Sequence, residues 1–551
     1  MSALPSRLRR DAWGIASALF YFAAGQPFLP RLGIENDEAL FASPILSPRY
    51  GLAPFRVWHT HFALMLMSYL GTLKTLILLP VIKVFGANVW SVREPMLLAG
   101  AASIWIFYLL VERVAGVRAA RIGAVLLAAD SLYLLTTCFD WGPVALQHLL
   151  LVTGMFFAMR FYKERRELLL AAAFCAFGLA LWDKALAIWM LSGIAIAALG
   201  VFPREILALL SKRRLAIAAG AFLAGALPLV IYNLPRQMPT FHGNFTYDVS
   251  ELPVKARMLV GTAHGGALLG FFNQDDWQTP YPHRPAGPIG RFSVNLSQWA
   301  GHPGQDLFLF ALVLALLLAP FAWGRGWRAL LFSLTAMALA WAQMAATAGA
   351  GGSAHHTILL WPLPQMFVAV SFAAAAERFG RARIAIAAAV AVVCASSLVV
   401  TNEYYVRMAR NGGPAAWTDA FTPLNAYLLD TPATAVYCMD WGFLDTLRLL
   451  SMGKLPLREG SEIVSRAVPL PQDREAVLEM IADRSHVFVT HPPSIAFFHV
   501  ADGNLARLAL EEGYRRENIA AIRDSYGRLM FEVYRFQKAP ASSPRETKTT
   551  P

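Results

Sequence analysis

Two adjacent carboxylates lie in a short polar stretch that follows the first apolar run. The stretch is Gly33-Ile34-Glu35-Asn36-Asp37-Glu38-Ala39. Carboxylates are costly to keep near lipid, and a positioned one can act as a general base toward a hydroxyl group. Asp37 and Glu38 are therefore candidate catalytic residues, as a base or facing a metal ion. The structural alternative is that they stabilise the N-terminus of a helix beginning near Ala39.

Charged residues also interrupt apolar runs at three later points. Asp140, in Cys138-Phe139-Asp140-Trp141-Gly142-Pro143, could act on a substrate or cap the helix that begins near Trp141. Asp183 and Lys184 share another short turn, where the cation could face a phosphate or the two could form a local ion pair. Lys74 could hold a lipid phosphate or extend its ammonium group to the headgroups.

A histidine pair follows a glycine-rich stretch late in the chain. His355 and His356 come shortly after the stretch Gly349 to Gly352, whose glycines would allow a ligand to approach closely. Adjacent histidines point to different helix faces, so a shared metal ion is not expected. The pair could bind substrate or be structural. The long polar stretch 233–304 could grip a substrate or be a solvated loop.

Composition identifies a membrane protein. The chain has 551 residues, of which 56% are hydrophobic and 15% are charged, whereas soluble domains carry about 25% charge. A net charge of +12 would suggest nucleic-acid binding in a soluble protein. Here Lys and Arg cluster in short loops between apolar runs, which is a signal of membrane topology, so no nucleic-acid partner is expected. P-loop, GxSxG, HExxH and CxxC motifs are absent from the sequence, which disfavours ATP-driven transport and metalloprotease chemistry.

The apolar runs and basic loops predict eleven crossings of the membrane. A further run, 62–85, contains Lys74, Pro80 and Lys83, and counting it as a crossing would put the later basic loops outside. We expect it to lie in the outer face of the membrane or to be re-entrant. The N-terminus is then cytoplasmic, and 31–93 and 233–304 are outer segments. The scarcity of Lys beside Ala and Arg is typical of a high-GC bacterium, so a plasma (inner) membrane is expected. The predicted crossings lie near 12–30, 95–113, 119–137, 142–160, 168–181, 185–200, 214–232, 305–323, 329–348, 357–376 and 384–401.

The chain changes character from residue 402. Strand-like runs at 435–439, 486–490 and 529–534 alternate with helix-like runs at 443–452, 473–482 and 504–512. This alternation predicts a small α/β domain over 402–538, outside the membrane (periplasmic or extracellular). The polar stretch 539–551 is expected to be disordered.

The order of these motifs resembles the GT-C class of membrane glycosyltransferases, and within it the protein O-mannosyltransferase and aminoarabinose-transferase branch. The resemblance covers about 1–400. The late histidine motif is the weakest part, since an Arg and a Tyr are more usual there. The stretches that carry it are Asn36-Asp37-Glu38-Ala39, Gly71 to Gly86 followed by Arg93, Asp140-Trp141-Gly142-Pro143, Gly178-Leu179-Ala180-Leu181-Trp182-Asp183-Lys184, and His355-His356 before Pro362 and Pro364.

This resemblance implies an α-helical polytopic membrane protein with the GT-C fold, about eleven transmembrane helices and a catalytic domain over 1–401. It also implies inverting transfer of a sugar from a polyprenyl-phosphate donor to a hydroxyl group of a protein, lipid or glycan acceptor. The expected partners are therefore the polyprenyl-phosphate sugar donor, the acceptor and membrane lipid. The resemblance leaves open whether a divalent metal is needed.

Residue roles follow from the same resemblance. Asp37 would be the base, Asp140 and Glu38 would orient the donor or a metal, and Lys74 and Lys184 would neutralise the phosphate. Asp183, His355 and His356 are candidates for substrate binding. A transporter or flippase of lipid-linked sugars would need the same cavity and charges and stays open as an alternative. A structural subunit that anchors the C-terminal domain would leave the charged turns unexplained.

Overall fold

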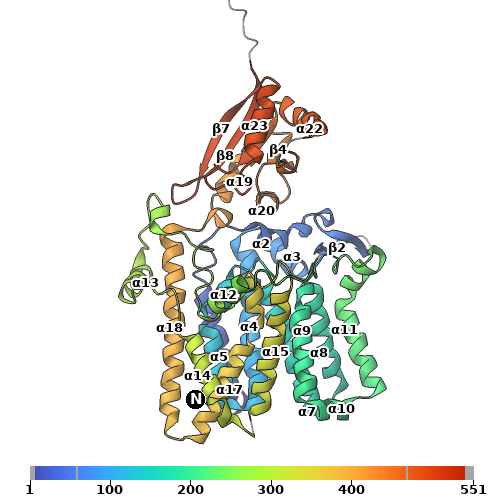
Figure 1. Cartoon of the computed structure of the whole chain (residues 1–551). Coiled ribbons are helices and arrows are strands. Elements are labelled where there is room, and N and C mark those ends of the chain that lie inside the picture. The colour runs from blue at the N-terminus through green and yellow to red at the C-terminus, as the bar shows by residue number, and fades with distance from the viewer. Residues whose placement is uncertain (1–5, 58–59, 243, 325, 467–469, 540–551) are drawn as a thin grey trace, which may run out of the picture. The chain divides into compact units, whose positions relative to one another are not determined.

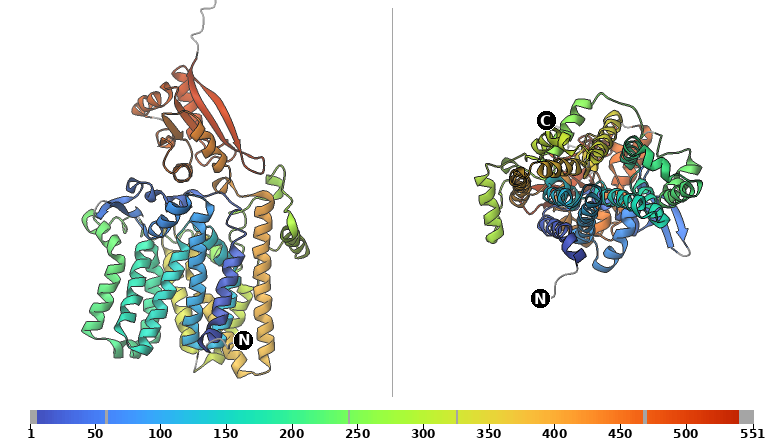
Figure 2. Two further views of the ribbon diagram at one scale, coloured as in Figure 1. Left: turned by 180° about the vertical axis from the view of Figure 1, so that it is seen from behind. Right: turned by 90° about the horizontal axis from the view of Figure 1, so that it is seen from below.

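A computed structural model describes residues 6–57, 60–242, 244–324, 326–466 and 470–539. The chain divides into two compact units. The larger unit contains 1–32, 37–275 and 283–414, and the smaller one contains 33–36, 276–282 and 415–551. Both can be followed by colour in Figures 1 and 2.

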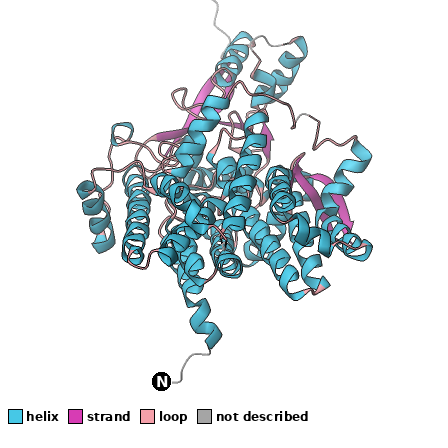
Figure 3. Cartoon of the chain, turned by 60° about the horizontal axis from the view of Figure 1, so that its bottom comes forward, coloured by secondary structure: helices cyan, strands magenta, loops and turns pink. Residues whose placement is uncertain are grey.

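The larger unit is a bundle of helices whose apolar side chains are partly buried and partly exposed. Phe310 and Leu317 of one helix are each 70% exposed, as expected for side chains that face lipid. Helices dominate the unit in Figure 3. The chain is therefore an α-helical polytopic membrane protein. The bundle helices are α1 (Ser6–Gly25), α4 (Val89–Ala115), α5 (Val117–Ala129), α6 (Ser131–Cys138), α7 (Val144–Glu164), α8 (Glu167–Asp183), α9 (Ile188–Val201), α11 (Lys212–Asn233), α14 (Phe308–Leu318), α15 (Trp327–Ala346), α17 (Leu363–Arg378) and α18 (Ala382–Asn411).

Each predicted crossing corresponds to one of these helices or to a bent pair. Within the described residues, six helices are long and apolar enough to span a membrane, and up to eight if each of two bent pairs is one span. One pair, α5 and α6, bends by 57°, where the Asp130 side chain caps α6 by accepting the Tyr133 N–H. The expected number of about eleven crossings stays a prediction.

The apolar run 62–85 is part strand and part helix. It contains most of β2 (Thr60–Met67), then β3 (Leu70–Gly71) and α3 (Leu73–Phe85), and β2 pairs antiparallel with β1 (Leu52–Val57) and with β3. The 13 residues of α3 extend about 20 Å, which is less than the ~30 Å of a bilayer core. This helix is too short to cross, in keeping with the expected surface placement. Its strands were not predicted.

The two outer segments contain further short helices. The first includes α2 (Asn36–Leu40). The long segment 233–304 contains α12 (Leu252–Ala263) and α13 (Gly287–Trp299), and α16 (Ala354–Thr357) precedes α17. In Figure 1, α2, α3 and α12 lie at the same end of the bundle, opposite the N-terminus.

The smaller unit is a five-stranded sheet between two layers of helices. The strand order is β5-β4-β6-β8-β7, with β4 parallel to β5 and β6, and β8 antiparallel to β6 and β7. Alternate residues of β4 face opposite layers, so Val436 packs with α19 and α20 while Tyr437 packs with α22 and α23. The elements are α19 (Phe421–Asp430), β4 (Ala435–Cys438), α20 (Leu444–Leu450), β5 (Leu457–Glu459), α22 (Pro471–Ala482), β6 (His486–Thr490), α23 (Ala501–Glu511), β7 (Tyr514–Arg523) and β8 (Leu529–Lys538).

This unit confirms the expected α/β architecture. Helix α18 continues to Asn411, and the sheet-containing unit includes 415–551, while the domain boundary at 402 stays a prediction. The three predicted strands and three predicted helices all form, whereas β5 and β7 were not predicted. Residues 540–551 of the expected disordered tail lie outside the described residues.

Candidate active site

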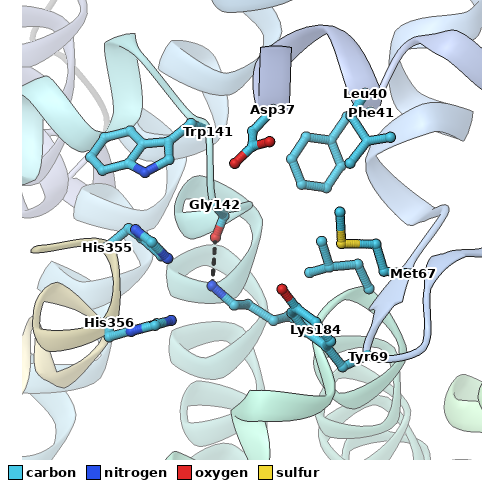
Figure 4. Close-up of a pocket in the computed structure, with 11 residues that line it drawn as sticks. Asp37, Leu40, Phe41, Met67, Tyr69, Trp141, Gly142, Lys184, His355 and His356 are labelled. Carbon is cyan, nitrogen blue, oxygen red and sulfur yellow. Dashed lines mark hydrogen bonds between the residues drawn. The ribbon is translucent and has the colours of Figure 1, made fainter. Parts of the chain in front are cut away.

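A cavity lies in the larger unit, where α8 ends and α16 begins. Its volume is about 370 Å³, a figure that includes space open to solvent. Figure 4 shows the side chains that line it. They are Asp37, Leu40, Phe41, Met67, Tyr69, Leu70, Trp141, Gly142, Lys184, His355 and His356.

Asp37 provides the carboxylate of this lining. It is half-buried on α2, and Leu40 and Phe41 from the same segment form the adjoining apolar wall. In Figure 4 its side chain points between Trp141 and Phe41 into the cavity. A carboxylate in this position can accept a proton from a bound hydroxyl group.

Glu38, the next residue, is turned toward α4. Its carboxylate forms a fully buried ion pair with Arg93, with Nε–Oε1 and Nη2–Oε2 distances of 2.9 and 2.6 Å. Arg93 also donates to the carbonyl oxygens of Leu29 and Leu32. Glu38 is not among the cavity-lining residues. Its contacts are those of a residue that fixes the segment after α1 against α4.

Lys184 provides the ammonium group of the lining. It follows the last residue of α8, and its Nζ donates to the carbonyl oxygen of Gly142 at 3.1 Å. Burial lowers the pKa of Lys184 to about 8, while the carboxylates of Asp140, Asp183 and Asp37 act in the opposite direction. The lysine is therefore mostly charged at neutral pH and can bind an anion.

The backbone around Lys184 is fixed by the β2–β3 segment. The Ala185 N–H donates to the Tyr69 carbonyl oxygen at 2.9 Å, and Leu70 forms an antiparallel bridge with Lys184. A Cβ atom on Gly71 would lie 2.1 Å from the Trp182 carbonyl oxygen. Only glycine allows this approach, which explains the glycine before the α3 helix.

Asp140 and Lys74 pair with each other, and neither is among the cavity-lining residues. The Lys74 Nζ lies 3.0 Å from the Asp140 Oδ2, and both side chains are at most 2% exposed. The other oxygen, Oδ1, accepts the N–H groups of Val144 and Ala145 at the start of α7. The Asp140 carboxylate therefore satisfies the first N–H groups of α7, and its part in orienting a donor or metal stays a prediction.

Asp183 is fully buried and faces α7. Its Oδ2 accepts a hydrogen bond from the Gln147 Nε2 at 2.9 Å. Expected as a substrate-binding residue, it lies outside the cavity lining. The structure brings together Asp37, Lys184, His355 and His356, and it places Glu38, Lys74, Asp140 and Asp183 outside this set.

Both histidines of the late motif line the cavity. The His355 Nδ1 lies 2.8 Å from the Ser353 Oγ, and its ring packs edge-on against Trp141. A Cβ atom on Gly142 would lie 2.8 Å from the His355 ring, so the glycine makes room for the histidine.

Lys255 supports this region and was not predicted. It is fully buried on α12, and its Nζ donates to the carbonyl oxygens of Ala345 and Thr347 at the end of α15. Because it lies in the long polar stretch 233–304, no feature of its sequence neighbourhood distinguished it from a solvated lysine.

The arrangement of His, Cys, Asp and Glu side chains bears on whether the protein could hold a metal ion. Within the described ranges, no group of three or more His, Cys, Asp or Glu residues is arranged to hold a metal ion. The cavity itself offers one carboxylate, one ammonium group and two imidazoles beside an apolar wall. These groups suit a ligand with a phosphate, a hydroxyl group and an apolar chain.

Sequence comparisons relate one part of the chain to mannosyltransferases. Residues 73–232 match the family model of dolichyl-phosphate-mannose-protein mannosyltransferases. A Bacillus subtilis (strain 168) protein named "Putative mannosyltransferase YkcB" is 29% identical over 176 residues. That match covers 31% of this chain and 24% of the relative, so the chain spans about a quarter of the length of the relative it matches.

Structural similarity extends over nearly the whole chain. ArnT from Cupriavidus metallidurans bound to undecaprenyl phosphate is 15% identical, with a TM-score of 0.54 over 95% of this chain and 97% of ArnT. The apo form of ArnT gives a TM-score of 0.57 at 14% identity over the same shares. The Archaeoglobus fulgidus oligosaccharyltransferase gives 0.51 at 14% identity, over 98% of this chain and 76% of that one. The chain therefore has the fold of the GT-C superfamily of membrane glycosyltransferases.

Proposed function

We propose that the protein transfers a sugar from a polyprenyl-phosphate donor to an acceptor hydroxyl group at the outer face of a bacterial plasma membrane. One observation carries this proposal: the Asp37 carboxylate and the Lys184 ammonium group line the same cavity. The match of residues 73–232 to a family of lipid-phosphate-sugar transferases supports it. So does the similarity to ArnT, whose structure contains undecaprenyl phosphate.

The two charged groups have complementary roles in this reaction. Asp37 accepts the proton of the acceptor hydroxyl group as its oxygen attacks the anomeric carbon. The bond between that carbon and the phosphate oxygen breaks, and its electron pair leaves with the lipid phosphate. Lys184 stabilises the charge that develops on the phosphate, most strongly where water is excluded.

The cavity composition favours a single displacement. Asp37 is the only carboxylate among the described residues that line it. A double displacement through a sugar–enzyme intermediate uses a second carboxylate about 5 Å away as the nucleophile. With one base and one leaving-group cation, the configuration of the anomeric carbon inverts.

The distribution of basic residues supports the outer location of the cavity. Arg7, Arg9 and Arg10 belong to the first turns of α1, and Arg165 and Arg166 lie between α7 and α8. Asp37 and Lys184 follow the opposite ends of α1 and α8. Since basic loops face the cytoplasm, the cavity end faces outward.

Glu38, Lys74 and Asp140 are proposed to position Asp37 and Lys184 rather than to contact the substrate. The Glu38–Arg93 pair positions the Asp37 segment, and the Lys74–Asp140 pair positions the turn whose Gly142 carbonyl oxygen binds Lys184.

To test the function, purified protein in lipid nanodiscs would be given polyprenyl-phosphate sugars with candidate protein, lipid and glycan acceptors. Acceptor-dependent transfer of one sugar is the expected result. Movement of an intact donor across a vesicle membrane without transfer would instead favour a transporter.

A further inference from the structure

We infer that His356 is a phosphate-binding residue that donates an Nε2–H hydrogen bond to the lipid phosphate beside Lys184. This inference rests on the proposed function for the identity of the ligand. Its geometric basis is the orientation of one imidazole ring in the cavity.

The hydrogen on the His356 ring can be assigned from its neighbour. The backbone N–H of Gly351 lies 3.3 Å from the His356 Nδ1. A backbone amide only donates, so Nδ1 is the acceptor and carries no hydrogen in this arrangement. The neutral ring then carries its hydrogen on Nε2, because each ring nitrogen's state is set by the hydrogen bond that the other makes.

The His356 Nε2–H group has no hydrogen-bond partner among the described residues. Among the described residues, no hydrogen bond is formed by the His356 Nε2, and the residue lines the cavity together with Lys184. Figure 4 shows its ring extending into the same space as the Lys184 side chain. By contrast, the Nε2 of the buried His148 bonds the Ile358 carbonyl oxygen at 2.8 Å. The His356 Nε2–H and the Lys184 ammonium group are therefore suited to binding an anion together.

The segment that carries Gly351 and His356 is fixed by residues outside the cavity lining. Gly351 has a φ of +75°, and a Cβ atom there would lie 3.6 Å from the Lys255 Cδ. Lys255 binds the end of α15, and the hydroxyl groups of Thr262 and Thr357 lie 2.6 Å apart, joining α12 to α16. The donor is thus oriented before a ligand binds, which is how binding sites gain strength without reorganisation.

The chemistry of the leaving group explains why a neutral donor is useful. The donor sugar phosphate is a diester with one negative charge, and the released lipid phosphate is a monoester with up to two. A hydrogen bond from a neutral N–H to an anion strengthens as that charge builds up. Loss of such a bond weakens binding by roughly 10- to 100-fold.

Direct binding of a short-chain prenyl phosphate tests the inference without sugar or acceptor. Farnesyl phosphate would be titrated into full-length protein as wild type, His356→Leu, His356→Gln and His242→Leu. The exposed His242 lies outside the cavity lining and serves as the matched control. Thermal unfolding of each variant would confirm that it is folded. Farnesol, which lacks the phosphate, would measure binding of the apolar chain alone.

We expect His356→Leu to weaken binding of farnesyl phosphate at least about tenfold, with farnesol binding unchanged. His356→Gln should retain most of the affinity, because its amide N–H lies near the position of Nε2, and His242→Leu should bind as the wild type does. Wild-type affinity in folded His356→Leu would overturn the inference. So would wild-type protein that binds farnesyl phosphate no better than farnesol.

Nitrogen-15 NMR of histidine-labelled protein provides a second readout. The resonances missing in His356→Leu identify the ring, which should be the Nε2–H tautomer and should shift when farnesyl phosphate binds. An Nδ1–H tautomer would overturn the inference. If binding behaves as expected but no sugar is transferred, the proposed function fails while the His356 assignment stands. If sugar is transferred but His356→Leu keeps full affinity for farnesyl phosphate, the His356 assignment fails while the proposed function stands.

Discussion

Arg93 holds Glu38 through two parallel hydrogen bonds of 2.9 and 2.6 Å in a fully buried pair, while Asp37, the neighbouring acid, lines the cavity. Two adjacent carboxylates therefore have different surroundings. The bidentate pair fixes the backbone from which Asp37 projects.

Substitution of Glu38 is expected to reduce stability rather than to alter chemistry alone. Glu38→Gln removes the charge that balances Arg93 in a buried site, which costs roughly 3–5 kcal/mol. A lower unfolding temperature in detergent would show this. Asp37→Asn, with the same chemical change one residue earlier, should unfold close to the wild-type temperature. Equal unfolding temperatures for Glu38→Gln and wild type would contradict the structural role.

The two lysines of the predicted phosphate site should behave differently. Lys184→Met removes the cavity's ammonium group and should raise the donor KM about 10- to 100-fold at nearly unchanged stability. Lys74→Met leaves Asp140 without its buried partner and should lower the unfolding temperature. Steady-state kinetics and thermal unfolding of both variants separate these effects. The assignment is wrong if Lys74→Met raises KM with no loss of stability.

The contact between Gly71 and Trp182 should tolerate no side chain. In Gly71→Ala, the added Cβ would approach the Trp182 carbonyl oxygen to 2.1 Å and force apart the bridge between Leu70 and Lys184. We expect donor turnover to fall at least about tenfold. Gly220→Ala, on an open face of α11, is the matched control and should keep full turnover. Wild-type turnover in Gly71→Ala would show that the bridge does not position Lys184.

The pH dependence of donor use should report Lys184. Its pKa is lowered from 10.5 to about 8, so the cation is present below pH 8 and is lost as the pH rises above it. The kcat/KM for the donor should therefore fall by up to about tenfold per pH unit above 8. Lys184→Arg stays charged and should lack this decline if it retains activity. A wild-type profile that is flat up to pH 10 would contradict the assignment.

Local patterns predicted most of the architecture. Apolar runs about as long as a bilayer is thick gave the bundle helices, and alternating runs after 402 gave the α/β unit. Strands β1 and β2 were not predicted because local hydropathy does not distinguish a short apolar strand from part of an apolar helix. Helix α18 extends past the expected boundary because its polar last turns carry no apolar signal.

The site was predicted in its residue types but not in its partners. Asp37, Lys184 and the histidines were named from sequence, and the structure places them in one cavity. Their neighbours Glu38 and Asp140 looked equivalent to Asp37, because no local pattern shows that Arg93 and Lys74 pair with them. Lys255 was missed for the same reason, since its two carbonyl partners lie about 90 residues later in the chain.

The most direct test of Asp37 as the catalytic base is the release of polyprenyl phosphate from a polyprenyl-phosphate sugar by purified wild type and Asp37→Asn, side by side and with an acceptor present. We expect release by the wild type and a loss of roughly 100-fold or more in a mutant that still binds the donor and remains folded. Full turnover by Asp37→Asn would contradict the assignment of Asp37 as the base. Donor binding without turnover by wild type across all sugars and acceptors would contradict the transferase function itself.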